Sequence, residues 1–163
     1  MGDSSKIGGD GGEGEIVMDE ALNLLGFKFT LIGPSKVTGH LKVTKYCCQP
    51  FKALNGGVSA LIAEATSSLG AYCAAGYKRV AGVQLSINHI KPAMLGDEIE
   101  VEAVPIQVGQ SIQVWEVKIW RMDPLTPNNK KLASTSRVTL LSNLTTPPEM
   151  KFYADAVKLF SKL

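Results

Sequence analysis

A single carboxylate stands in the middle of an otherwise apolar stretch of the chain. Residues 49–68 read QPFKALNGGVSALIAEATSS, and Glu64 is the only charged residue between Lys52 and Lys78. If the stretch is helical, positions four and seven residues from Glu64 share its face. All of these neighbours are small: Gly57, Ala60, Ser68 and Ala71. Glu64 is therefore either a functional acid that another molecule can approach closely, or a solvated residue on the outer face of an amphipathic helix.

The start of the same helix supplies a second candidate group. Asn55 is a favourable N-cap residue, and Gly56 and Gly57 follow it. Backbone N–H groups at the positive end of the helix dipole can hold an anion or a developing oxyanion. The alternative is that the two glycines only permit a tight turn. An amide donor for the oxyanion, together with a carboxylate that attacks or activates water, is what hydrolysis of an acyl group requires.

Gly56 and Glu64 are too far apart to act on one carbonyl group within a single helix. Eight residues correspond to about 12 Å of α-helix. Two copies of the helix running antiparallel across a two-fold axis would bring the start of one to the middle of the other. We therefore expect a homo-oligomer, at least a dimer, in which two subunits share each site.

The elements that must position these groups are one long helix and several strands. Apolar residues at three- and four-residue spacing predict a helix over residues 55–73. The side chains expected to pack on a sheet are Val58, Leu61, Ile62, Ala65, Leu69 and Tyr72. Residues 26–45 predict two short strands with a turn at Gly33-Pro34. Further strands, rich in β-branched and aromatic residues, are predicted at residues 79–91, 97–108, 111–122 and 131–142. The predicted fold class is α+β, with one long helix against an antiparallel sheet of about five to six strands.

The two ends of the sequence are expected to lie outside the main domain, which we place at residues 16–145. Residues 1–15 are rich in glycine and polar, so a flexible leader is expected. Residues 146–163 are predicted to form a short helix followed by Ser161-Lys162-Leu163. A terminal SKL tripeptide is read by the peroxisomal import receptor, so a peroxisomal location is expected.

Composition narrows the possible partners. The chain has 163 residues and a formal net charge of +2 with the two signs mixed along it, so neither nucleic acid nor an anionic membrane surface is an expected partner. No apolar run approaches the ~20 residues that span a bilayer. His40 and His89 stand apart from the three cysteines and from each other, so no metal site is expected.

The motif around Glu64 resembles the active-site segment of hotdog-fold acyl-CoA thioesterases. QPFKALNGGVSALIAEATSSLGAY is similar to the pattern QP…LHGG…AE…S of the branch that includes type II 4-hydroxybenzoyl-CoA and phenylacetic-acid-pathway enzymes. The similarity continues through GVQLSINHIKPA, VGQSIQVWEV and LASTSRVTLL, and covers about residues 20–142. With the SKL ending, the chain resembles the plant peroxisomal 1,4-dihydroxy-2-naphthoyl-CoA thioesterases of phylloquinone (vitamin K1) biosynthesis. The resemblance implies a hotdog fold, a dimer or tetramer, and hydrolysis of an aromatic acyl-CoA without a separate cofactor.

The resemblance also assigns roles to individual residues. Glu64 matches the family's catalytic carboxylate, which acts as nucleophile or as general base on water. Gly56 matches the glycine whose N–H polarises the thioester carbonyl, Gln49 the active-site glutamine, and Ser68 the hydroxyl residue that helps to place water or substrate. The residues that match the CoA-binding segments are Gly82, His89, Ile90, Lys91, Pro92, Gln107, Val108, Gly109, Gln110 and Ser111. Lys91 is a candidate for a phosphate contact. Taken alone, Lys91 is more typical of a solvated surface lysine, and His89 of a strand-end histidine satisfied by the backbone.

One position departs from the family pattern. Asn55 stands where the motif has histidine, which is assigned a supporting role near the thioester. Asparagine can still cap the helix and donate a hydrogen bond. Because of this departure, one alternative stays open: a protein that binds acyl-CoA without hydrolysing it. A thioesterase for fatty or other aromatic acyl-CoA is a further alternative.

Overall fold

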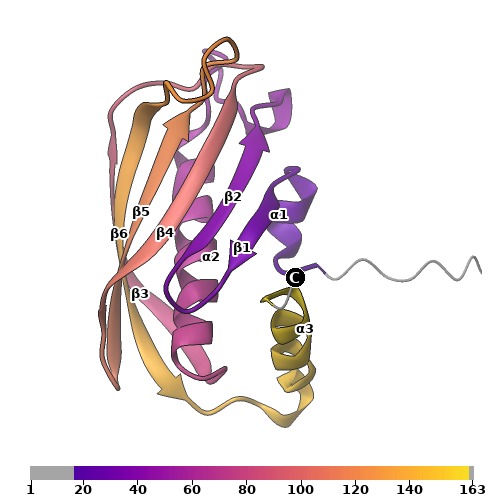
Figure 1. Ribbon diagram of the computed structural model, residues 1–163, viewed down its shortest axis with the longest axis vertical. Coiled ribbons are helices and arrows are strands. Elements are labelled where there is room, and N and C mark those ends of the chain that lie inside the picture. Colours follow the sequence, from indigo (N-terminus) through magenta and orange to yellow (C-terminus); the bar gives the residue numbers. More distant parts are fainter. Residues whose placement is uncertain (1–16, 162–163) are drawn as a thin grey trace, which may run out of the picture.

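An antiparallel sheet of six strands forms one layer of the molecule (Figure 1). The computed structural model describes residues 17–161, so the predicted leader and the last two residues of the SKL tripeptide lie outside the described part. The strand order is β1-β2-β4-β5-β6-β3, with β3 at one edge. The strands are β1 (Lys28–Ile32), β2 (Val37–Lys42), β3 (Arg79–His89), β4 (Glu98–Val108), β5 (Ile112–Arg121) and β6 (Lys131–Leu144).

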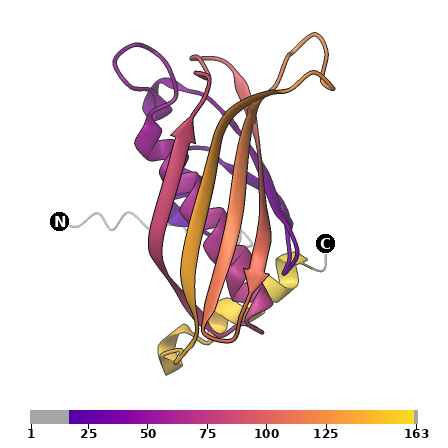
Figure 2. The same cartoon turned by 90° about the vertical axis from the view of Figure 1, so that its left-hand side faces the viewer.

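The long helix α2 (Gly56–Ala74) packs on one face of this sheet. Figure 2 shows it crossing behind β3, β6, β5 and β4. It begins after Asn55, whose side-chain Oδ1 accepts a hydrogen bond from the Gly57 amide at 2.7 Å. The predicted α+β class, with one long helix on an antiparallel sheet, is confirmed.

The buried face of α2 differs from the predicted one. Its most buried positions include the small or polar residues Ser59, Ala63, Thr66, Ser67 and Gly70. A Cβ at Gly70 would overlap the indole of Trp115 on β5, so the helix backbone lies directly against the sheet there. The buried hydroxyls bond to the helix itself: Thr66 Oγ1 donates to the Ile62 carbonyl and Ser67 Oγ to the Ala63 carbonyl, both at 2.7 Å.

The predicted apolar stripe therefore faces the sheet only in part. Ile62, Leu69 and Tyr72 are buried, whereas Val58, Leu61 and Ala65 are half-buried. The prediction was wrong here because apolar spacing reports which side chains avoid water, whereas close helix–sheet contact selects small side chains.

The two ends of the described chain cover the flank of α2. They contain α1 (Glu20–Leu24), the short 3-10 helix η2 (Pro148–Met150) and α3 (Phe152–Ser161). The Tyr153 hydroxyl donates to the Met18 carbonyl at 2.8 Å, and Val157 of α3 is fully buried. The short helix α1, which the sequence did not predict, is capped by Asp19, whose carboxylate accepts from the Leu22 amide at 2.9 Å. Another 3-10 helix, η1 (Lys45–Cys47), precedes α2. Among the described residues, none of the helices is long and apolar enough to cross a membrane.

Candidate functional site

Glu64 lies at an open, solvent-accessible position on α2, against the edge strand of the sheet. A Cβ placed on Gly82 of β3 would come within 2.6 Å of Glu64 Oε1. The missing side chain at position 82 therefore leaves the space that the carboxylate occupies. Gly82 was predicted as a CoA-binding residue, and the structure places it beside the candidate acid.

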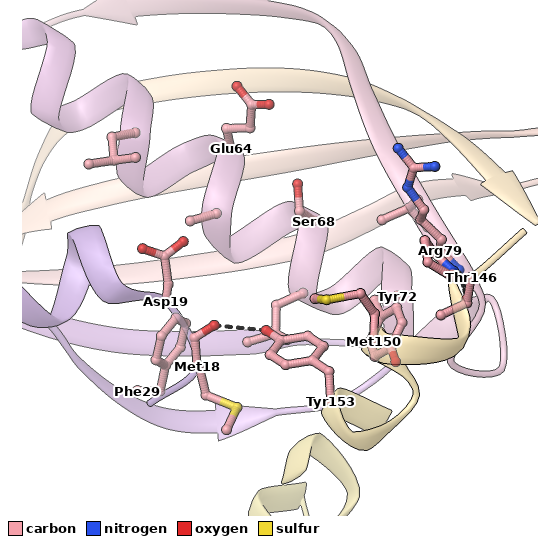
Figure 3. Close-up of a pocket in the computed structure, with 15 residues that line it drawn as sticks. Met18, Asp19, Phe29, Glu64, Ser68, Tyr72, Arg79, Thr146, Met150 and Tyr153 are labelled. Carbon is pink, nitrogen blue, oxygen red and sulfur yellow. Dashed lines mark hydrogen bonds between the residues drawn. The ribbon is translucent and has the colours of Figure 1, made fainter. Parts of the chain in front are cut away.

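A cavity of about 630 Å³ lies next to Glu64, between α2 and the two ends of the chain (Figure 3). Glu64 and Ser68, one turn apart on α2, both line it, as the sequence prediction required of an acid and its neighbouring hydroxyl. Most of the remaining wall is apolar or aromatic, formed by Met18, Phe29, Leu61, Ala65, Leu69, Tyr72, Val80, Pro147, Met150 and Tyr153. A cavity of this size, with few polar groups, suits a small organic molecule.

The two tyrosines of the cavity are held in the protonated form. Burial raises the pKa of Tyr153 to about 12, and burial also raises the pKa of Tyr72. Their rings lie 5.5 Å apart and tilted, which is favourable for an aromatic pair. Near neutral pH, both hydroxyls therefore keep their proton, and that of Tyr153 is donated to the Met18 carbonyl.

A second cavity, of about 360 Å³, opens at the start of α2. It brings together predicted site residues from three segments: Gln49, Gly56, and the run His89, Ile90, Lys91 and Pro92. The imidazole of His89 packs against the helix start, since a Cβ on Gly56 would lie 3.0 Å from His89 Nε2. The Asn55 cap uses the amide of Gly57, and the amide of Gly56 lies outside that cap.

Gln49 is fixed by its own turn. Its side-chain Oε1 accepts a hydrogen bond from the Phe51 amide at 2.5 Å, and its backbone N–H donates to the Ala53 carbonyl at 2.9 Å. With Oε1 engaged, the NH₂ group is the end of the side chain that can donate to a ligand.

The predicted site residues thus form two groups within one chain. Glu64, Ser68 and Gly82 lie at one end of β3, and Gly56, Gln49 and His89 to Pro92 lie at the other. The seven residues from Gly82 to His89 correspond to about 23 Å of strand.

The remaining predicted CoA-binding residues, 107–111, belong to the first group. Gln107 and Val108 end β4, and residues 109–111 form the turn to β5. This turn bonds to the end of β6. The Ser142 amide donates to the Ser111 carbonyl at 2.9 Å, and the Asn143 side chain donates to the Gln110 carbonyl. The end of β6 in turn pairs with Ala81 and Gly82 of β3.

Several residues of the larger cavity were not predicted as site residues. Arg79, Thr146, Met150, Tyr153, Met18 and Asp19 line it together with Glu64. They come from both ends of the fold and from the start of β3, and no spacing in the sequence connects them to the motif around Glu64. Among the described residues, no cluster of three or more histidine, cysteine, aspartate or glutamate side chains could hold a metal ion.

Comparisons with known proteins place this geometry in a family. Residues 51–127 match the model of the thioesterase superfamily. The chain is 52% identical to 1,4-dihydroxy-2-naphthoyl-CoA thioesterase 2 of Arabidopsis thaliana over 151 residues, which cover 91% of this chain and 96% of that protein. It is 30% identical to the 1,4-dihydroxy-2-naphthoyl-CoA hydrolase of Escherichia coli, covering 72% of this chain and 84% of the relative. The crystal structure of a Haemophilus influenzae thioesterase superposes with a TM-score of 0.65 at 32% identity, covering 74% and 80% of the two chains.

The chain belongs to the thioesterase superfamily, and its architecture is the hotdog fold predicted from the motif. It is a thioester hydrolase.

Proposed function

We propose that this chain hydrolyses 1,4-dihydroxy-2-naphthoyl-CoA to 1,4-dihydroxy-2-naphthoate and CoA, in phylloquinone biosynthesis. The observation that carries the proposal is Glu64 at the rim of an aromatic-lined cavity, in a chain 52% identical to a plant thioesterase named for this substrate. The E. coli relative is named for the same substrate, which supports an aromatic acyl group.

In the proposed reaction, the amide of Gly56 binds the thioester oxygen and Glu64 delivers the attack. As general base, Glu64 takes a proton from water while the water oxygen bonds to the carbonyl carbon. The oxyanion that forms is stabilised by the Gly56 amide at the positive end of α2. The carbon–sulfur bond then breaks, and the CoA sulfur takes the proton from Glu64. As nucleophile, the carboxylate would instead attack the carbonyl carbon and displace CoA as the thiolate, which gives a mixed anhydride that water then hydrolyses.

This mechanism requires two chains, because the acid and the amide lie at opposite ends of β3. The sheet order leaves β3 with β6 on one side and an open edge on the other. Pairing this edge antiparallel with the same strand of a second copy would bring Gly82 of one chain near His89 of the other. We therefore propose a homodimer as the smallest active unit, and a tetramer as a dimer of such dimers.

The register of this pairing can be derived from the strand itself. Opposed residues of an antiparallel pair point to the same face of the sheet. Across a two-fold axis perpendicular to the sheet, the central residue must therefore oppose its own copy. Leu85 and Ser86 lie midway between Gly82 and His89, so one of these two is the expected centre.

The bound CoA would then lie across both subunits. His89 to Pro92 of one chain and residues 107–111 of the other would flank the same opening, and Lys91 would meet a phosphate. CoA enters as part of the substrate, and the proposed reaction uses no separate cofactor.

Release of free thiol from a panel of acyl-CoA thioesters tests the reaction directly. We expect the highest kcat/KM with dihydroxynaphthoyl-CoA, a lower value with benzoyl-CoA and the lowest with fatty acyl-CoA. Fastest release from a fatty acyl-CoA would overturn the proposed substrate. Binding of the thioesters without any release of thiol would instead indicate an acyl-CoA-binding protein.

We also propose import into peroxisomes through Ser161-Lys162-Leu163, on the basis of that tripeptide. A fluorescent fusion ending in these residues should enter peroxisomes, and the same fusion without them should remain in the cytosol. Peroxisomal fluorescence of the shortened fusion would contradict this address.

A further inference from the structure

The larger cavity is built from two parts of the chain, one inside and one outside the region that the family model matches. One wall belongs to the region matched by the family model and contains α2 and the start of β3. The opposite wall comes from residues outside 51–127: Met18, Asp19, Phe29, Thr146, Pro147, Met150 and Tyr153. The family core therefore supplies the acid, while the ends of this chain close the space beside it.

The outer wall is fixed to the rest of the molecule. The Tyr153 hydroxyl donates to the Met18 carbonyl at 2.8 Å and so joins the two ends of the chain. The Tyr153 ring packs on Tyr72 of α2, and Val157, one turn further along α3, is fully buried in the core. An anchored wall of this kind restricts the shape of what can enter.

The chemistry of the lining favours a flat aromatic group. Phe29, Tyr72 and Tyr153 offer ring surfaces, and the thioethers of Met18 and Met150 are polarisable groups that pack well against rings. Figure 3 shows Met150 and Tyr153 below Ser68, on the far side of the cavity from Glu64. An acyl group that lies between this far wall and Glu64 would have its carbonyl end at the Glu64 carboxylate.

We propose that the acyl group of the substrate occupies this cavity and that Met150 and Tyr153, from the C-terminal segment, determine which acyl groups fit. The inference rests on the proposed thioesterase function and adds the residues that select its substrate. Neither residue acts on the thioester. They shape the space in which the ring lies, so substitutions of these two residues should change the ratio of kcat/KM between substrates.

Exchanging the size of residue 150 tests the proposal on the full-length chain. Met150→Trp fills the cavity, so kcat/KM for dihydroxynaphthoyl-CoA should fall by about 10-fold or more, in the range that pocket shape commonly controls. With acetyl-CoA, whose acyl group does not reach the far wall, kcat/KM should change less than about two-fold. Met150→Ala widens the space and should raise kcat/KM for bulkier acyl groups relative to dihydroxynaphthoyl-CoA.

Two further variants serve as controls. Phe152→Trp enlarges a 66% exposed residue of the same segment that does not line the cavity, and it should leave every ratio unchanged. Tyr153→Phe keeps the ring but removes the hydrogen bond to Met18, so it should loosen the wall and weaken the preference for the aromatic substrate. Thermal unfolding of each variant establishes that it is folded.

The outcomes separate this inference from the proposed function. If the wild-type chain hydrolyses no acyl-CoA, the proposed function fails. If the wild type is active and both changes at Met150 leave the substrate ratios unchanged, the acyl group lies elsewhere and the inference is overturned. An equal loss with all substrates, acetyl-CoA included, would also overturn it, because it would show a role in folding or positioning and none in selection.

Discussion

The position of the Glu64 carboxylate depends on a glycine from another element. A Cβ on Gly82 would lie 2.6 Å from Glu64 Oε1, so any larger residue there would displace the carboxylate. Gly82 belongs to the edge strand that we expect to pair with a second copy. The acid is therefore held at the same place where a partner chain would approach.

The first prediction concerns a substitution that removes the charge of Glu64 and keeps its shape. Glu64→Gln removes the negative charge needed to activate water or attack the carbonyl, so kcat should fall by about 10²–10⁴-fold. The fold and the affinity for CoA should survive, because Glu64 is exposed and the change is isosteric. Steady-state kinetics and CoA binding by calorimetry measure the two effects separately.

The matched control is Glu98→Gln, at an exposed carboxylate at the start of β4 away from both cavities. It should leave kcat unchanged within error, as surface substitutions away from special features usually have small effects. Near-normal turnover by Glu64→Gln would refute the proposed mechanism and leave Glu64 as a solvated residue on the helix surface.

At the scale of elements, the contact between α2 and β5 is the least tolerant of change. Gly70→Ala would place a methyl group inside the indole of Trp115, in contact with ring atoms Cη2 and Cζ3. Overpacking of this kind costs typically about 1–3 kcal/mol. We expect a lower midpoint of urea unfolding, even though alanine is the better helix former.

A double-mutant cycle distinguishes this overlap from a general loss of stability. Trp115→Phe removes the two ring atoms that the new methyl group would meet, although it also removes the hydrogen bond from Trp115 Nε1 to Gln113 Oε1 at 2.9 Å. Gly70→Ala should therefore cost less in the Trp115→Phe background than in the wild type. Additive losses would mean that the helix and strand do not meet at this point.

The sequence predicted the elements better than the contacts between them. The strand runs and the Asn55 cap could be recognised because alternation, β-branched residues and capping chemistry are local properties. The face of α2 that packs on the sheet could not, because Gly70 and Ser59 are buried through the path of the backbone and not through their hydrophobicity. The short helix α1 was missed because five residues carry too few turns to show a period.

The residues of the candidate site also divide into those that the sequence predicted and those that only the structure brings together. The motif connected Glu64, Ser68 and Gly56 because they share one helix. Met18, Met150 and Tyr153 come together only through the fold, since 135 residues separate Met18 from Tyr153. The wall that they form could be found only from the structure.

At the scale of the whole molecule, the proposed dimer predicts a specific cross-link. Leu85→Cys or Ser86→Cys should form a disulfide with the same residue of the partner, since one of them lies at the two-fold axis. Asn88→Cys should not, because its copy would be at least about 13 Å away along the strand, beyond the ~7 Å limit between Cα atoms in a disulfide. Non-reducing electrophoresis of the three variants checks this, and cross-linking of Asn88→Cys alone would contradict the proposed register. Of the native cysteines, Cys47 and Cys73 are buried and Cys48 is half-buried, so the three variants are made in a Cys48→Ser background.

Each site of the proposed dimer takes its acid from one chain and its amide from the other. This sharing is tested by combining two inactive variants. In Gly56→Pro the backbone N–H is absent, and proline is tolerated at the first position of a helix. Gly56→Ala retains the N–H and adds the same Cβ beside His89, so it controls for crowding.

The decisive measurement is the activity of a 1:1 mixture of Glu64→Gln and Gly56→Pro chains, unfolded and refolded together. In a mixed dimer, one of the two sites would combine an intact Glu64 with an intact Gly56 amide. Random pairing makes half of the dimers mixed, so a site shared between two chains should give roughly one quarter of the wild-type thioesterase activity. Activity no higher than the sum of the two variants alone, in a sample where differently tagged chains co-purify, would contradict the shared site.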